Sequence, residues 1–159
     1  MRLELARELI KTLAVERRVR ARISALVAVD RVNLGDLRDV VARIALSDRS
    51  AKVKVLAADK IRSWNRTGLI PDLESAIEKE GNLTRRRVLE RQRDLLKDGY
   101  SIEPSMNSGV WITCQQEHGG VIGRWASADE FREKGVAGIA KDLGVRLENR
   151  LTLVGADAP

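Results

Sequence analysis

Apolar residues recur every three to four positions through the first hundred residues, and this spacing predicts helices there. Residues 2–28 read as one long helix, with a bend near Thr12 left open, in which leucine and other aliphatic residues keep the helical interval. The same interval predicts further helices at about residues 36–46, 48–66, 71–80 and 85–97. Because the 159 residues include only three Trp, one Tyr and one Phe, aliphatic side chains must fill the core.

Capping and turn residues mark the expected ends of these helices. Ser47 and Thr84 are predicted N-caps, because a hydroxyl can accept a hydrogen bond from the free amides of a first turn. Gly68 and Gly99 are placed to end helices in left-handed turns.

After residue 100 the pattern changes from helical to alternating. Residues 109–114 and 121–125 are expected to form two strands joined by the turn Glu117-His118-Gly119-Gly120. Ser127 is expected to cap a helix at about 128–143, and residues 145–154 are expected to form a third strand.

The predicted fold class is therefore mainly α, with two parts. Residues 1–100 form a helical body, and residues 101–159 form a small α+β module of β-hairpin, helix and strand. Trp111 and Trp125 lie on the predicted hairpin, so this module is the expected place for self-association or partner binding.

Charge is distributed unevenly between these parts. Residues 1–100 contain 23 Lys and Arg against 15 Asp and Glu, whereas residues 101–159 contain 6 against 8. A basic body with a mildly acidic tail is typical of a protein in which one part meets a polyanion. A solvated helical surface would show the same excess, and its charges would be paired along each helix.

Catalytic and metal chemistry have little support in the residues. Cys114 is the single cysteine and His118 the single histidine, so disulfides and Cys- or His-rich zinc sites are excluded. We expect Cys114 to be a small buried side chain on a strand and His118 to be exposed in a turn. We expect no catalytic residues, no metal and no cofactor, and hence not an enzyme. A small enzyme that uses Cys114 or His118 is an alternative function, but the sequence shows no further catalytic residues to accompany them.

The chain shows no secretory leader and no run of eighteen apolar residues, so no membrane partner is expected. With one cysteine, a reducing compartment is favoured, and the expected location is cytoplasmic.

Two basic helices are the best candidates for a nucleic-acid site, because guanidinium and ammonium groups bind phosphates and a helix fits the major groove of DNA. The predicted nucleic-acid-binding residues are Arg49, Lys52, Lys54, Lys60, Arg62, Asn65, Arg66, Arg85, Arg86, Arg87, Arg91 and Arg93. Most would contact phosphates, while Arg62 or Asn65 would supply any base preference.

The run Ile61-Arg62-Ser63-Trp64-Asn65-Arg66-Thr67-Gly68-Leu69-Ile70-Pro71 resembles the end of the helix-turn-helix in MerR-type regulators. In that family a Gly-aromatic-Ser-Leu/Ile turn follows about thirty residues later, and here Gly99-Tyr100-Ser101-Ile102 lies 31 residues after Gly68. The resemblance implies DNA binding.

A second resemblance is to phage small terminase subunits, in which an amphipathic helix, a short break and a basic helix follow one another. Residues 37–46, Ser47-Asp48-Arg49-Ser50 and Lys52–Trp64 are similar to that unit. It too implies a DNA partner.

The sequence therefore predicts a non-enzymatic protein that binds duplex DNA, either a transcription regulator or a phage-type packaging or accessory factor. Structured RNA remains open as the partner. The alternative function is a protein–protein interaction adaptor whose helical body docks on an acidic partner.

Overall fold

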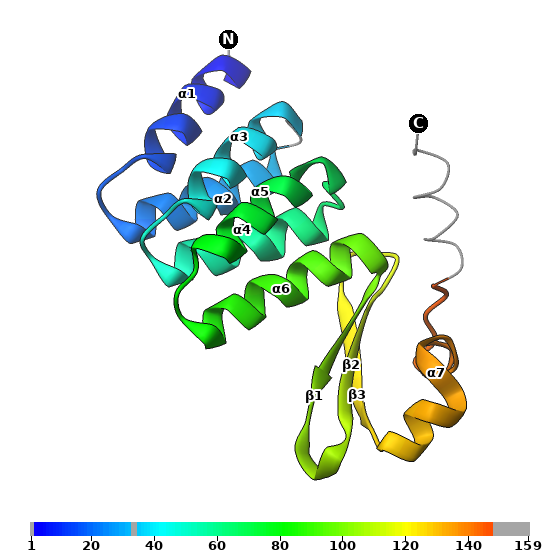
Figure 1. Ribbon diagram of the computed structural model, residues 1–159. Coiled ribbons are helices and arrows are strands. Elements are labelled where there is room, and N and C mark those ends of the chain that lie inside the picture. Colours follow the sequence, from blue (N-terminus) through cyan, green and yellow to red (C-terminus); the bar gives the residue numbers. More distant parts are fainter. Residues whose placement is uncertain (1, 33–34, 148–159) are drawn as a thin grey trace. The chain divides into compact units, whose positions relative to one another are not determined.

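The computed structural model describes residues 2–32 and 35–147, and these residues are mainly helical (Figure 1). They form seven α-helices, two short 3-10 helices and one three-stranded antiparallel sheet toward the C-terminal side, as the predicted fold class requires. The chain divides into two compact units, Met1–Arg93 and Asp94–Pro159. We call the first the helical unit and the second the sheet unit.

The helical unit is a stack of helices held together by aliphatic side chains. Among the fully buried residues are Leu26, Leu37, Ile61 and Leu73. The helices are α1 (Arg2–Ala14), α2 (Val19–Arg31), α3 (Gly35–Leu46), α4 (Ala51–Ser63), α5 (Ile70–Lys79) and, up to Arg93, α6 (Leu83–Asp98). From α1 to α4 each helix packs on the next, α2 also contacts α4, and α5 contacts α3.

The prediction of one long helix over residues 2–28, with or without a bend near Thr12, is wrong, because the structure has two helices there. The chain leaves the helical conformation after Ala14 and re-enters it at Val19. The Arg22 guanidinium donates 2.8 Å hydrogen bonds to the carbonyl oxygens of Glu16 and Arg17, which the break leaves without helical partners. Neither Gly nor Pro marks this break, so the local sequence carries no signal for it.

The start of the next basic helix also differs from the prediction. Ser47 does not cap it, because α4 begins later, at Ala51. Asp48 organises the connection instead, since its carboxylate accepts hydrogen bonds from the Ser50 amide at 2.8 Å and the Arg22 guanidinium at 2.6 Å.

Of the predicted capping residues around α6 and after α4, one is confirmed and two are wrong. Thr84 lies inside the helix rather than before it, and Asn82 accepts the Arg85 amide at 3.0 Å in its place. Gly99 has a φ of 84° and follows the end of α6 as predicted. The left-handed residue after α4 is Asn65, with a φ of 55°, rather than Gly68.

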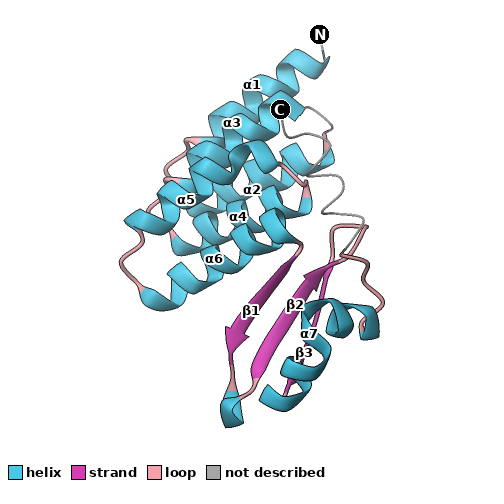
Figure 2. Cartoon of the chain, turned by 45° about the vertical axis from the view of Figure 1, so that its right-hand side comes forward, coloured by secondary structure: helices cyan, strands magenta, loops and turns pink. Residues whose placement is uncertain are grey.

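The sheet unit contains β1 (Tyr100–Pro104), β2 (Val110–Gln115), β3 (Val121–Ala126) and α7 (Ala128–Asp142). The strands follow the order β1-β2-β3, and α7 covers one face of the sheet (Figure 2). The predicted hairpin is confirmed as β2 and β3. The predicted Ser127 cap is also confirmed, because its hydroxyl accepts the Glu130 amide at 3.1 Å.

The third strand lies elsewhere than predicted. It is β1, which precedes the hairpin and pairs with β2 from Tyr100 opposite Cys114 to Pro104 opposite Val110. Residues 145–147 are not in a strand, and residues 148–154 lie outside the described residues. Because β1 is short and includes a charged residue and a proline, its strand character depends on pairing with β2.

Glu80 joins three elements of the helical unit. Its carboxylate accepts hydrogen bonds from Lys54 on α4 at 3.0 Å, from Arg85 on α6 at 3.2 Å and from the Asn82 amide at 3.1 Å. The Lys54 bond, followed by the Asn82 amide and Arg85, lowers the pKa of Glu80 to about 2 from an ordinary 4.5. The carboxylate therefore stabilises the fold above pH 4.5, and this contribution is lost as the pH falls toward about 2.

We expect Glu80→Gln to lower the free energy of unfolding at neutral pH by about 2 kcal/mol, because Lys54 loses its buried anionic partner. The gap between variant and wild type should close as the pH falls through the acid range. Urea denaturation followed by circular dichroism at several pH values measures this. Glu78→Gln, at an exposed position of α5, is the control and should change stability by less than about 0.5 kcal/mol. A gap that does not vary with pH would contradict the assignment.

Candidate nucleic-acid interface

Intramolecular ion pairs engage several of the cations that the sequence assigns to a nucleic-acid site. The ammonium group of Lys54 lies 3.0 Å from Glu80, and that of Lys60 lies 2.7 Å from Asp30. Arg66 approaches Asp39 at 3.2 Å. Each of these pairs joins two elements, so the side chains serve the packing of the helical unit.

Arg62 is more deeply buried than these three cations. It is 5% exposed, and its guanidinium donates to Asp59 at 2.8 Å and to Gln92 at 2.6 Å. The base contact suggested for Arg62 would require these bonds to break. Asn65 is exposed and takes the left-handed turn after α4.

Trp64, which lies near Arg62 in the sequence, also has a structural role, because it binds Asp30. The carboxylate of Asp30 accepts the indole N–H of Trp64 at 2.6 Å on one oxygen and Lys60 on the other. Arg38 donates to the Asp30 carbonyl at 2.8 Å, and its guanidinium lies 5.2 Å from the centre of the Trp64 ring. Hydrogen bonds from Lys60 and then Trp64 lower the pKa of Asp30. This cluster ties the end of α2 to α3 and α4.

The arginines of α6 are only partly available. Arg85 pairs with Glu80 and Arg86 with Glu90, both at 3.2 Å, although both guanidinium groups remain nearly half exposed. Arg87 is exposed and forms no ion pair with another described residue. Arg91 and Arg93 are half-buried and already have partners.

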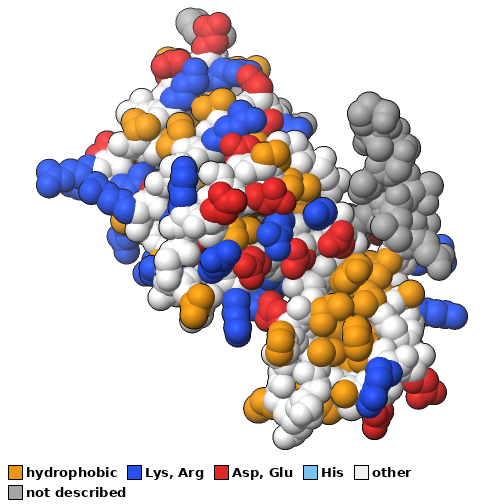
Figure 3. All heavy atoms as spheres, viewed as in Figure 1, with side chains coloured by type: hydrophobic (Ala, Val, Ile, Leu, Met, Phe, Trp, Pro, Cys, Tyr) orange, Lys and Arg blue, Asp and Glu red, His pale blue; other side chains and the backbone are white. Residues whose placement is uncertain are grey.

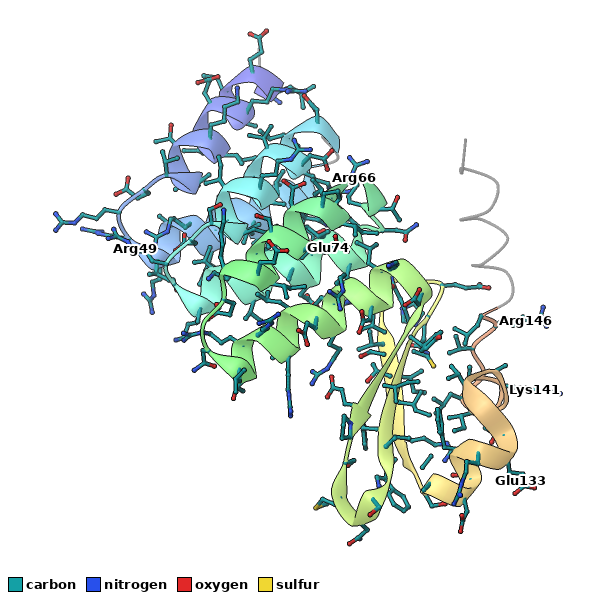
Figure 4. The ribbon with its side chains drawn as sticks, in the orientation of Figure 1. Arg49, Arg66, Glu74, Glu133, Lys141 and Arg146 are labelled. Atoms are coloured by element: carbon teal, nitrogen blue, oxygen red, sulfur yellow. The ribbon has the colours of Figure 1, made fainter. Side chains whose placement is uncertain are left out.

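Arg49 and Lys52 differ from the other predicted residues of α4. Both are exposed, and neither forms an ion pair within the described part of the chain. Figure 4 shows Arg49 pointing away from the helical unit beside the α1–α2 connection. The two side chains are therefore available to an external anion.

Three further cations, which the sequence did not single out, lie beside them. Arg17 and Arg18 lie in the α1–α2 connection, and Arg20 lies in the first turn of α2; all are exposed. The connection is held next to the α3–α4 connection by Arg22, which binds Asp48 on one side and the carbonyls of Glu16 and Arg17 on the other. We call the set Arg17, Arg18, Arg20, Arg49 and Lys52 the basic rim.

Figure 3 shows Lys and Arg side chains gathered at this edge of the helical unit. None of the five forms an ion pair with another described residue. The sequence does show a dense run of arginines from Arg17 to Arg22. In one long helix these side chains would point in different directions, so the sequence did not predict that they lie at one edge.

Two helix N-termini lie at the basic rim. Helices α2 and α4 contact each other, neither has an acidic residue in its first turn, and neither N-cap side chain binds the free amides. Burial raises the pKa of Asp48, but hydrogen bonds from Arg22 and the Ser50 amide outweigh burial and hold it below its ordinary value. The Asp48 carboxylate is thus already neutralised by Arg22. The free amides at the N-termini of α2 and α4, together with the rim cations, favour binding of an external anion.

A hollow of about 460 Å³ lies elsewhere in the helical unit, among α3, α4 and α5. Arg43, Lys54 and Lys79 contribute cations to its wall. Arg43 lies 3.5 Å from Asp72, and Lys54 is bound to Glu80. The hollow is therefore less available to an anion than the basic rim.

Cys114 and His118 do not form a pair for nucleophilic chemistry in the sheet unit. Cys114 is fully buried in the core with Ile112, Ala126 and Ile139, and burial raises the pKa of its thiol. His118 is exposed in the β2–β3 turn, where its Nδ1 accepts the Gly120 amide at 3.2 Å. Within residues 2–32 and 35–147, no three His, Cys, Asp or Glu side chains come together as a metal site. No described helix is long and apolar enough to cross a membrane.

Comparison with protein families, with curated proteins and with solved structures found no match to this chain.

Cations that are bound inside the fold and cations that are exposed without an ion pair should differ in how much their replacement lowers stability. Arg62→Ala should lower the free energy of unfolding by about 2–3 kcal/mol, because Gln92 and Asp59 lose a buried donor. Arg49→Ala should change it by less than about 0.5 kcal/mol. Urea denaturation of both variants tests this, and equal losses would contradict this expectation.

Proposed function

We propose that the helical unit binds duplex DNA, without catalysis, through phosphate contacts made by the basic rim. The observation that carries the proposal is the set of five exposed cations brought to one edge by two connections. Their unit, residues 1–93, contains 22 Lys and Arg against 13 Asp and Glu. Guanidinium groups bind phosphate in two-pronged fashion, and the adjacent helix amides add further donors.

Phosphate contacts give affinity without sequence information, so the proposed binding has little base preference. Arg62 is engaged inside the fold, which leaves Asn65 as the exposed member of the two side chains considered for base contact. A regulator and a DNA-packaging factor are the two roles that the sequence resemblances imply. Both agree with the proposed cytoplasmic location.

Binding should weaken steeply with salt, because each neutralised phosphate releases condensed counterions. With about five contacts, the logarithm of the binding constant should fall with the logarithm of salt concentration at a slope of about −4.5. The triple variant Arg17→Ala/Arg18→Ala/Arg49→Ala should reduce the slope by about 2.7 and weaken binding to unrelated duplexes alike. Fluorescence anisotropy with labelled random duplex DNA measures both quantities.

The matched control removes the same charge from the sheet unit. Arg132, Lys141 and Arg146 are exposed there, and the last two are labelled in Figure 4. Their triple alanine variant should keep the wild-type slope and bind within about threefold, since only a general loss of charge acts on it. Equal weakening by both triple variants, or no salt-dependent binding at all, would overturn the proposal; absence of DNA binding would favour the adaptor function.

The run Arg85, Arg86 and Arg87 provides a second comparison within the helical unit. Its triple alanine variant removes three charges, but two of them are paired with Glu80 and Glu90 in the fold. We expect weaker DNA binding than wild type and a smaller loss than for the rim variant. Duplex RNA and single-stranded DNA, titrated in parallel, determine which polyanion is preferred.

A further inference from the structure

The hollow among α3, α4 and α5 has the size of a small-molecule site, although it offers fewer available cations than the basic rim. Its volume is about 460 Å³, and such sites measure about 300–1,000 Å³. Buried Leu46 and Ala76 give the wall an apolar part, and the other lining residues are polar or charged. No aromatic side chain of the described residues lines it, so a nucleotide base has no ring on which to stack. The hollow therefore suits a small polar molecule.

Helical spacing places the polar lining residues on one face of each helix. On α5, Asp72, Ser75 and Lys79 are three and four residues apart, so their side chains lie one above another. Arg43 and Ser47 are also four residues apart, at the last turn of α3 and just after it. Because α5 packs on α3, polar groups from both helices line the same hollow (Figure 1).

Most of these polar groups are not used by the fold. Lys79 is exposed and forms no ion pair with another described residue. The hydroxyls of Ser47 and Ser75 are exposed and form no hydrogen bond within the described part of the chain. Arg43 lies 3.5 Å from Asp72, but the two form no hydrogen bond. Donors and acceptors therefore line the hollow without partners that satisfy them.

We propose that the hollow binds a small phosphate ester that also carries hydroxyl groups, which is the chemistry of a sugar phosphate. Lys79 and the N–H groups of Arg43 bind the phosphate, because hydrogen bonds between a cation and an oxyanion are stronger than those between neutral groups. Lys54 also lines the hollow but stays bound to Glu80 and takes no part.

The acidic residue of the wall explains why the ligand needs hydroxyl groups as well as a phosphate. The carboxylate of Asp72 only accepts hydrogen bonds, so it repels a bare phosphate and attracts an O–H donor. The two serine hydroxyls can donate to or accept from further hydroxyl groups of the ligand. None of the lining residues belongs to the basic rim, so this inference is independent of the DNA-binding proposal.

The test uses the full-length chain, glucose 6-phosphate and isothermal titration calorimetry. Glucose and inorganic phosphate should each bind at least about tenfold more weakly than the ester, because each lacks one set of contacts. Asp72→Asn should weaken binding of the ester about threefold without weakening binding of inorganic phosphate, since the carboxylate serves only the hydroxyl groups. Inorganic phosphate that binds as tightly as the ester would overturn the proposal.

Lys79 provides the comparison of charge with a matched control. Lys79→Ala should weaken binding of the ester more than about fivefold, whereas Lys79→Arg keeps the charge and should bind within about threefold of wild type. Lys141→Ala removes the same charge from an exposed position of α7 and should bind as wild type does. Equal binding by the Lys79→Ala and Lys141→Ala variants would contradict the assignment.

A measurement on the wild-type chain removes any dependence on how the variants fold. In ¹H–¹⁵N NMR spectra, glucose 6-phosphate should shift the backbone amide signals of Ser75 and Lys79 and leave those of Arg17, Arg18 and Arg20 unchanged. Shifts confined to the three arginines would assign the phosphate to the basic rim and overturn the proposal, as would the absence of saturable shifts. Failure of DNA binding would leave these results unaffected, so the two proposals fail separately.

Discussion

Ion pairing between helices determines which cations of the helical unit remain available to other molecules. Arg7 binds Asp36, Arg22 binds Asp48 and Lys60 binds Asp30, each across a separation of more than twenty residues. A carboxylate that engages a cation on another helix neutralises it and fixes two elements together. Five of the exposed cations that remain, those of the basic rim, lie in or next to the α1–α2 and α3–α4 connections.

Two of these ion pairs are largely buried. The Arg22 and Asp48 side chains are 12% and 6% exposed, and those of Lys54 and Glu80 are 18% and 5% exposed. In such surroundings the loss of one partner leaves a charge without compensation, which costs more than the loss of a surface pair. By contrast, the rim cations are solvated, so their replacement is expected to affect binding and not folding.

The two units differ in how they present their surfaces. The helical unit exposes cations at its connections, and its tryptophan, Trp64, is half-buried, donates its indole N–H to Asp30 and lies beside the Arg38 guanidinium. In the sheet unit Arg124, the single Lys or Arg of the described strands, is bound to Glu130 on α7, and the two strand tryptophans are partly exposed. The described surfaces of the two units therefore differ in the side chains that they expose, cations on the first and indoles on the second.

The sequence by itself determined the elements whose signals are local. Helical spacing of aliphatic residues predicted most of the helices, and the turn at residues 117–120 predicted the β2–β3 hairpin. Gly99 and Ser127 correctly marked a helix end and a helix start, because left-handed backbone and amide capping depend on single residues. Tertiary structure decided the rest. The bond from Arg22, beside the break after Ala14, to Asp48, the pairing of β1 with β2 and the bond from Arg62 to Gln92 all join residues that are distant in the chain. For the same reason, the number of arginines could be read from the sequence, but which of them face solvent could not.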